Sequence, residues 1–484
     1  MTLPVGFLVE LDRHTRIVDD GRALVGGFPT RLIRLTPRAQ QHLTGRTLRV
    51  RDAASSLLAD RLLDLGMAHP VVASLPPPTD PRCTVVVPVR DRPRQLARLL
   101  GSVGGNHPVI VVDDASSDPK AVAAVTAEHG ATLVALTTNL GPAGARNAGL
   151  RLVTTPFVVF ADSDIVLAPD TVPILLRHFA DPAVAMAVPR ITGLPSPAPT
   201  WIERYENARS SLDLGAHPAG VRPGSPVSWA STACVVARVD SLADGFDERM
   251  RVGEDVDLCW RLIEQGRRLR YEPTAEAAHE HRARLDDWLL RKAVYGTGAQ
   301  PLAERHPRFI APAVFAPWSA ALLTALLAQR RWSVPVAGAV LVGVTLRIRH
   351  KVDGIQHPHQ LAVRLTANGA LAALAQASAL FNRHWWPLTV VGCVASRRVR
   401  RAAAVAALAD IALEYRRDRA PLDPVRYGVA RRLDDLAYGA GVWLSALKGR
   451  STAALRPRIT LTPSRRACAA LARYHSAGGV RRDA

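Results

Sequence analysis

The alternation of apolar and polar residues divides the chain into three regions. Residues 1–76 carry short apolar runs separated by turns, followed by an amphipathic helical pattern at 53–67. This region ends at the segment LPPPTD, where three consecutive prolines exclude regular secondary structure because proline has no backbone N–H to donate. We therefore predict a small N-terminal domain over residues 1–76.

Residues 82–305 alternate short β-branched runs with helical stretches. Examples of the runs are TVVVPV (84–89), VIVVDD (109–114) and FVVFADSD (157–164). Continuous apolar strands that alternate with helices are typical of a parallel sheet covered on both faces. The pattern predicts an α/β domain over residues 82–305.

The third region, residues 306–484, is predicted to be helical and apolar. Phe309–Gln329 contains 21 residues without a charge, and Ser333–Leu346 contains 14 more. The first is long enough to cross a bilayer as a helix, which takes ~20 residues, whereas the second fits a hairpin in one leaflet equally well. Arginines flank both stretches, as in segments that face the cytoplasm, so we expect membrane attachment. The alternative is a soluble subdomain of buried, alanine-rich helices.

The charge and the cysteine content limit the binding partners and the cellular compartment that we expect. The chain has 62 basic and 42 acidic residues, a net charge of +20, which fits an anionic membrane surface or a phosphate-bearing substrate. A nucleic-acid partner is not expected, because the aromatic residues form no basic–aromatic motif. Five scattered cysteines without Cys-x-x-Cys spacing, and an N-terminus without a signal-peptide pattern, indicate a reducing compartment. We expect the catalytic domain on the cytoplasmic side of the cell membrane.

Acidic residues follow the first two strands of the central domain. Asp91 comes after TVVVPV, and Asp113 and Asp114 end VIVVDD. Ligands of open parallel sheets bind at the carboxyl ends of the strands, so Asp91 and either Asp113 or Asp114 are expected to hold a nucleotide base and ribose. The alternative is that Asp114 and Ser116 only cap the following helix.

A glycine-rich segment, NLGPAGARNAGL (139–150), follows. Gly141 and Gly144 permit close backbone approach, and Arg146 offers a planar donor fork for a phosphate or uracil oxygen. The segment is not the G-x-G-x-x-G of a dinucleotide fold, which weighs against an oxidoreductase.

The segment DSD at 162–164 is the sharpest chemical signal. Asp162 and Asp164 follow a buried strand directly, and carboxylates at i and i+2 lie on the same side of an extended backbone. Two adjacent carboxylates at a strand end are costly unless a cation joins them. We expect Mg²⁺ or Mn²⁺, with diphosphate oxygens and water completing the coordination, and the alternative is a solvated turn.

A second acidic segment, GEDVDL, opens a helix near residue 254. The helix dipole favours acidic residues in the first turn of a helix, but three acids in four residues are more than helix capping requires. Asp255 is the candidate general base that takes a proton from an attacking hydroxyl. His279 follows a predicted strand and is a candidate third metal ligand, with His281 as a nearby rival.

The order of these motifs, from VVVPVRDR through DSD to GEDVDLCWRL and a histidine, resembles the family 2 inverting glycosyltransferases, which have the GT-A fold. The resemblance covers residues 84–282. It departs from the family at Ala115, where many members carry glycine, and in lacking the QxxRW motif of processive synthases. It implies donor contacts, metal ligands and a base at these positions: Asp91, Asp113, Arg146 and Asp162 for the donor, Asp162, Asp164 and His279 for the metal, and Asp255 for the base.

The N-terminal region resembles the small winged-helix-like peptide-binding domains of modified-peptide biosynthesis, typified by the pyrroloquinoline quinone chaperone. Its cues are a strand pair around Gly26–Gly27, RLIRLTPRA entering a helix, and a final helix before DLGMAHP. Such a domain before this transferase resembles the glycosyltransferases of the mycofactocin system. The resemblance implies β-linked transfer of glucose from UDP-glucose to a peptide-derived redox cofactor.

Two other functional classes remain open from the residues alone. A cell-envelope glycosyltransferase that acts on a polyprenol or polysaccharide would carry the same donor motifs. A non-catalytic peptide carrier could keep the fold, although the presence of Asp162, Asp164 and Asp255 speaks against it.

Overall fold

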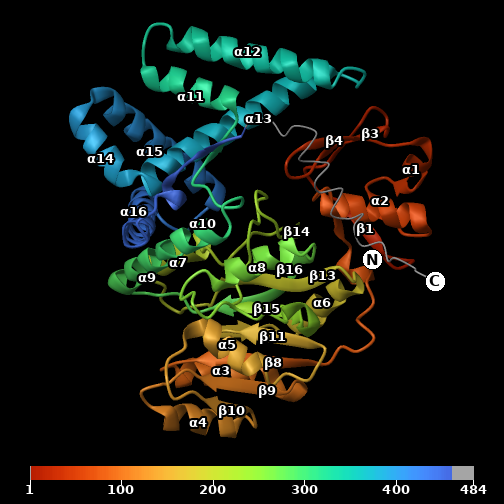
Figure 1. The fold of residues 1–484 in the computed structure, drawn as a ribbon, viewed down its shortest axis with the longest axis vertical. Helices are drawn as coiled ribbons and strands as arrows, with labels where there is room; N and C mark the ends of the chain where they lie inside the picture. The colour runs from red at the N-terminus through yellow and green to blue at the C-terminus, as the bar shows by residue number, and fades with distance from the viewer. Residues whose placement is uncertain (1, 461–484) are drawn as a thin grey trace, which may run out of the picture.

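The computed structural model describes residues 2–460, and its N-terminal region forms a small domain with a hydrophobic core of its own (Figure 1). The strand pair predicted around Gly26–Gly27 is confirmed as two antiparallel strands, and the predicted helix begins at a capping box made by Asp52 and Ser55. The domain contains a four-stranded sheet, a three-stranded sheet and two helices: β1 (Leu8–Leu11), β2 (Arg16–Val18), β3 (Ala23–Gly26), β4 (Arg31–Arg34), α1 (Pro37–Gln41), β5 (Leu43–Thr44), β6 (Thr47–Arg49), α2 (Ala53–Asp64) and β7 (Ala68–Pro70).

A nine-stranded sheet forms the centre of the molecule, with the order β10-β9-β8-β11-β15-β13-β16-β12 and β14 beside β16. The strands β10, β9, β8 and β11 are parallel, as the apolar runs predicted. The elements are β8 (Cys83–Val89), α3 (Pro93–Val103), β9 (Val109–Asp113), α4 (Pro119–Glu128), β10 (Thr132–Ala135), α5 (Gly141–Leu150), β11 (Phe157–Ala161), β12 (Ile165–Leu167), α6 (Thr171–Arg177), β13 (Val184–Gly193), α7 (Trp201–Arg209), β14 (Ala219–Gly220), β15 (Cys234–Arg238), α8 (Glu254–Glu264), β16 (Arg268–His279), α9 (Leu285–Thr297) and α10 (Ala299–Arg305).

Alternate residues of β8 explain why its sequence is apolar throughout. Val85 and Val87 belong to a core on one face of the sheet, and Val86 belongs to a second core on the other face. Successive side chains of a strand point to opposite faces, so a strand covered on both sides has no polar face. The α/β prediction is confirmed.

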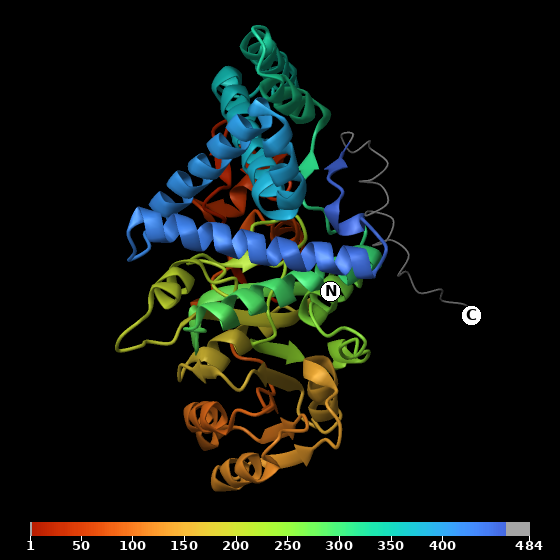
Figure 2. The ribbon, with the colours of Figure 1, turned by 90° about the vertical axis from the view of Figure 1, so that its left-hand side faces the viewer.

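The C-terminal helices share a core with the central domain. They are α11 (Pro317–Ala328), α12 (Ser333–Lys351), α13 (Pro358–Ala379), α14 (Trp386–Ala395), α15 (Arg397–Asp418) and α16 (Pro424–Lys448). The long helix α16 runs alongside α9 (Figure 2), and a Cβ at Gly441 would stand 1.8 Å from the carbonyl oxygen of Ala293. Trp288 of α9 and Tyr205 of α7 pack against Tyr427 of α16 in one cluster. This close packing joins the C-terminal helices to α7 and α9 of the central domain.

The prediction that Phe309–Gln329 can cross a bilayer as one helix is wrong. Helix α11 begins only at Pro317 and has 12 residues, a length of about 18 Å against the ~30 Å of a hydrocarbon core. The residues before it instead pair as β17 (Val314–Phe315) with β18 (Arg458–Ile459). Within residues 2–460, no helix is both long and apolar enough to span a membrane.

Ion pairs of Arg268 fix the N-terminal domain against the central sheet. Arg268, at the start of β16, donates to Asp60 and Asp64 of α2 at 2.5 and 2.7 Å, and to the buried Asp181 at 2.9 Å. On its other side the domain meets the loop after α12, where Arg34 of β4 donates to the carbonyl of Asp353 at 3.2 Å. The domain therefore lies between the central sheet and the C-terminal helices (Figure 1).

Candidate active site

The two acids of the DSD segment lie at the carboxyl end of β11, where strand pairing brings a histidine to them. Ile165 of β12 is the register partner of His279 at the end of β16. Nε2 of His279 consequently lies 3.6 Å from Oδ2 of Asp164, whose same oxygen accepts a hydrogen bond from Nη1 of Arg92. The structure thus brings together two predicted site residues, Asp164 and His279, and adds Arg92, which the sequence did not identify.

These residues fit a hard divalent cation. The carboxylate of Asp164 and the imidazole of His279 face each other, and Nδ1 of His279 is buried without a hydrogen-bond partner. Burial alone would raise the pKa of Asp164, but His279 and Arg92 hold it below its usual value, so the group is an anion at neutral pH. Within residues 2–460, no three His, Cys, Asp or Glu side chains converge on one point. A metal here would therefore depend on substrate oxygens for the rest of its coordination.

The rival histidine is not beside the acids. The ring centroid of His281 lies 5.7 Å from that of His279, and its Nε2 is buried without a partner. Burial and the charges of His279 and Lys292 lower the pKa of His281 to about 4, so its ring is neutral at pH 7.

Arg146 of α5 organises the acids on the other side of the cleft. Its Nη2 donates to Asp162 at 2.6 Å and its Nη1 donates to Glu254 at 2.9 Å, while the guanidinium carbon lies 5.5 Å from the centre of the Phe246 ring. The residue is only 4% exposed. Its terminal nitrogens are thus used by carboxylates, and its direct contact with a donor stays a prediction.

The three acids of GEDVDL, at the start of α8, have three different environments. Gly253, with φ of 82°, precedes the helix in a left-handed conformation that residues with a Cβ adopt rarely. Asp255 is half-buried and forms no ion pair within residues 2–460, whereas Glu254 pairs with Arg146. Asp257 is fully buried and accepts hydrogen bonds from Arg261 within α8 and from Arg305 of α10. Its Oδ1 also lies 2.9 Å from Nε2 of His306, at the end of α10.

The surroundings of Asp255 suit a general base. Burial and the negative charges of Glu254 and Asp162 raise the pKa of Asp255 to about 7, although Arg146 lowers it. At pH 7 a base with this pKa is about half deprotonated, and it binds a proton strongly enough to take one from a hydroxyl.

The predicted nucleotide-binding acids occupy the ends of β8 and β9. Oδ1 of Asp91 accepts hydrogen bonds from the backbone N–H and the hydroxyl of Ser117 at 2.7 and 2.6 Å. Asp113 is 2% exposed and accepts from the backbone N–H of Ser116 at 3.0 Å. Ala115 has φ of 56°, the left-handed conformation that explains the glycine of the family pattern.

The alternative interpretation of Asp114 as a helix cap is wrong. Asp118 caps α4 by accepting from the N–H of Ala121 at 3.1 Å. Asp114 instead accepts from the backbone N–H groups of Leu140 and Gly141 at 2.6 and 2.9 Å. It therefore fixes the start of the glycine-rich segment against β9.

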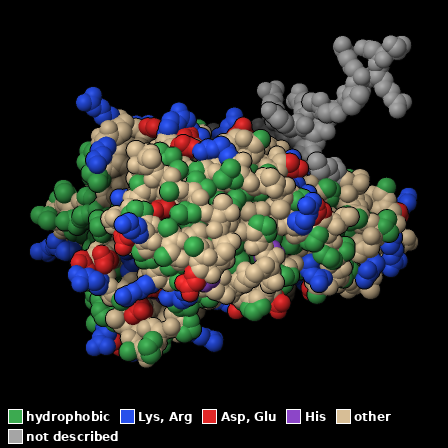
Figure 3. All heavy atoms as spheres, turned by 90° about the horizontal axis from the view of Figure 1, so that it is seen from below, with side chains coloured by type: hydrophobic (Ala, Val, Ile, Leu, Met, Phe, Trp, Pro, Cys, Tyr) green, Lys and Arg blue, Asp and Glu red, His purple; other side chains and the backbone are tan. Residues whose placement is uncertain are grey.

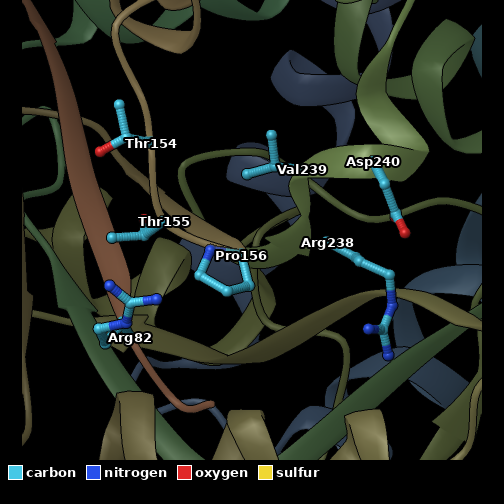
Figure 4. A pocket seen from close by; sticks show the side chains of 7 residues that line it. All are labelled: Arg82, Thr154, Thr155, Pro156, Arg238, Val239 and Asp240. Atoms are coloured by element: carbon cyan, nitrogen blue, oxygen red, sulfur yellow. The ribbon is translucent and has the colours of Figure 1, made fainter.

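A surface hollow of about 420 Å³ lies at the opposite ends of the strands (Figure 4). Pro156 of its lining directly precedes β11, whose other end carries Asp162. The hollow is therefore separate from the cleft that contains the acids. Its lining is Arg82, Thr154, Thr155, Pro156, Arg238, Val239 and Asp240.

Known proteins with similar sequences are glycosyltransferases. The chain matches the family patterns "Glycosyl transferase family 2" over residues 84–220 and "Glycosyl transferase family group 2" over residues 157–395. It is 42% identical to the pre-mycofactocin glycosyltransferase of Mycobacterium tuberculosis, over 94% of this chain and 98% of that protein. An N-acetylglucosaminyltransferase of Mesorhizobium japonicum is 29% identical, over 41% of this chain and 51% of that protein.

A solved structure with a similar fold is the mannosyltransferase of Pyrobaculum calidifontis in complex with GDP-Man and Mn²⁺. Its TM-score is 0.37 and its sequence identity is 22%, and the match covers 62% of this chain and 88% of that chain.

The pKa of Asp255 predicts the acid limb of the pH–rate profile. If Asp255 must be deprotonated to act, kcat/KM should fall tenfold per pH unit below about 7 and reach a plateau above it. Glu254→Gln removes a charge that raises this pKa, so the limb should move to lower pH. Glu264→Gln, an exposed acid at the far end of α8, is the matched control and should leave the limb in place. A limb that Glu254→Gln does not move would contradict this assignment.

Proposed function

Because the chain belongs to the family 2 glycosyltransferases, in the group of the mycofactocin system, we propose that it transfers glucose from UDP-glucose to a mycofactocin precursor, a peptide-derived redox cofactor, with inversion. The observation that carries the proposal is the end-to-end match to the Mycobacterium tuberculosis enzyme. The acids Asp162, Asp164 and Asp255 support it, because a non-catalytic carrier would tend to lose the acids of a site that it does not need.

In the proposed reaction Asp255 takes the proton of the acceptor hydroxyl. The hydroxyl oxygen attacks the anomeric carbon from the face opposite the diphosphate, and the bond between that carbon and the phosphate oxygen breaks. One displacement of this kind inverts the configuration, so an α-linked donor gives a β-linked product. Arg146 pairs with Asp162 and Glu254 and offsets part of the negative charge that these two acids place around the base.

We propose that Asp164 and His279, together with Asp162 two residues earlier in the chain, would hold Mg²⁺ or Mn²⁺ once oxygens of the substrate complete the coordination. When bound, the ion supplies positive charge to the departing diphosphate. For the nucleotide, we propose that Asp91 and Asp113 hold the base and ribose, since both stand at the carboxyl ends of parallel strands next to the cleft.

We propose that the N-terminal domain binds the peptide part of the acceptor. Strand β4 is the last strand of the sheet β2-β3-β4, so its outer edge offers backbone N–H and C=O groups to an extended peptide. The ion pairs of Arg268 hold this edge in a fixed position relative to the catalytic sheet. An acceptor anchored at β4 would therefore reach the cleft at a defined distance from Asp255.

The acceptor proposal is tested with the full-length protein, UDP-glucose and Mg²⁺. We expect a peptide-derived acceptor to gain one hexose by mass spectrometry, with a β-anomeric signal by NMR, and a photoreactive version of it to label residues 31–34. A polyprenyl phosphate should gain none. Hexose transfer to the polyprenyl phosphate alone would show that the cell-envelope alternative is correct, and an α-linked product would overturn the single displacement.

We also propose that the enzyme works at the surface of an anionic membrane, in contact through α12 and α14 rather than through a spanning helix. Large apolar side chains on these helices are exposed: Val334 by 75%, Val342 by 59%, Val391 by 67% and Val394 by 83%. The basic run SRRVRR (396–401) directly follows α14. Apolar and basic side chains gather at the side of the molecule where α14 lies (Figure 3), a combination that suits anionic headgroups over an apolar layer.

Vesicle sedimentation tests this surface. The full-length protein should sediment with vesicles that contain phosphatidylglycerol, less with phosphatidylcholine alone, and less at high salt, because the basic residues contribute ~1 kcal/mol each near the surface. Val391→Asp combined with Val394→Asp should abolish sedimentation without loss of donor binding. Leu57→Asp, at a side chain 72% exposed on α2, is the matched control and should sediment like the wild type. If the double variant sediments equally, α14 is not the contact.

A further inference from the structure

A small pocket opens beside His279, between α7, the end of β16 and α9. Its volume is about 40 Å³. A water needs ~10–15 Å³ of such space, so the pocket has room for about three waters or for one phosphoryl group. Its lining is polar and aromatic, and includes His279, His281, Arg282, Arg291 and Tyr295.

Two arginines of this pocket have no acid partner. Within residues 2–460, neither Arg282 nor Arg291 has a carboxylate oxygen within 4 Å, whereas the neighbouring Lys292 pairs with Glu206 at 2.9 Å. Arg282 lies in the turn between β16 and α9 and is half-buried. Arg291 lies on α9 with its guanidinium carbon 4.8 Å from the centre of the Tyr295 ring, which limits its orientations.

Both guanidinium groups lie within electrostatic reach of the DSD acids. Burial lowers the pKa of Arg291, but Tyr295, Asp162 and Asp164 more than offset this and raise it. Burial and nearby arginine charges lower the pKa of Arg282, an effect that Asp164 opposes. An anion in the pocket would therefore meet two cations on one side and the proposed metal ligands on the other.

We propose that Arg282 and Arg291 bind the β-phosphate of the nucleotide-sugar donor and neutralise it as it leaves. The inference rests on the proposed function and adds donor contacts that the sequence motifs did not identify. As the acceptor oxygen bonds to the anomeric carbon, the electron pair of the breaking bond passes to a β-phosphate oxygen, and the hydroxyl proton passes to Asp255. Guanidinium N–H groups directed at that oxygen stabilise the charge where it develops.

The position of the pocket favours the diphosphate over an acidic group of the acceptor. His279 forms part of the wall, so a bound anion lies next to Asp164. The buried Nε2 of His281 has no partner and adds hydrogen-bonding capacity. Within residues 2–460, the two arginines are the cations of this wall without a carboxylate oxygen within 4 Å. An acceptor carboxylate is the rival ligand, and the experiment below separates the two.

The test is calorimetry of the full-length protein with UDP, UMP and inorganic diphosphate, each in the presence of Mg²⁺. The variants are Arg282→Gln and Arg291→Gln, and Arg284→Gln is the matched control, because Arg284 is exposed and pairs with Asp286 at 2.8 Å. Each of the two variants should bind UDP and diphosphate ~10-fold or more weakly, since a charge-assisted hydrogen bond is lost. UMP affinity should change less than about twofold and also reports that the variant is folded.

Unchanged affinity for UDP and diphosphate in both variants would overturn the inference. A loss confined to the KM of the acceptor would overturn it too, and would assign the pocket to the acceptor. If the wild type binds diphosphate but not UDP, the proposed donor is wrong. The affinities of the variants for diphosphate then still decide whether the two arginines bind it. A wild type that binds neither contradicts both.

Discussion

The cleft depends on the buried guanidinium of Arg146. Asp162 at the end of β11 lies close to Glu254 and Asp255 at the start of α8, and unpaired carboxylates there would repel one another. Arg146 joins Asp162 of β11 to Glu254 of α8 at 2.6 and 2.9 Å, so it fixes the start of α8 against the sheet. A buried cation is costly unless it is paired, and removing one partner of such a pair typically costs 3–5 kcal/mol. The same contacts leave Asp255 next to negative charge, which gives it the properties of a base.

Support for this cluster comes from outside the catalytic sheet. Asp257 ties α8 to α10 through Arg305 and His306, and α10 continues from α9, which packs closely on α16. The C-terminal helices therefore hold the helix that carries the base, while the N-terminal domain is fixed to β16 through Arg268.

Much of this could be predicted from the sequence, because the motifs of the GT-A fold are local. A buried strand that ends in DSD, and a glycine before three acids at a helix start, place Asp162, Asp164 and Asp255 without any long-range information. The fold and the membership in family 2 are confirmed. The partners could not be predicted: Arg146 and Glu254 are 108 residues apart, and Arg92 and Asp164 are 72 apart. The uncharged run at 309–329 suggested one long helix. The sequence could not show that β17 interrupts this run, because its partner β18 lies more than a hundred residues further along the chain.

The proposed role of Asp255 as the general base of a direct displacement determines how the whole site works. The most direct test compares the single-turnover rate of Asp255→Asn with its affinity for UDP-glucose, because the substitution keeps the shape of the side chain and removes its ability to take a proton. If Asp255 is the base, the single-turnover rate of the variant should lie about 10²–10⁴-fold below that of the wild type, with donor affinity unchanged within about twofold. A variant that keeps more than about a tenth of the wild-type rate would contradict it.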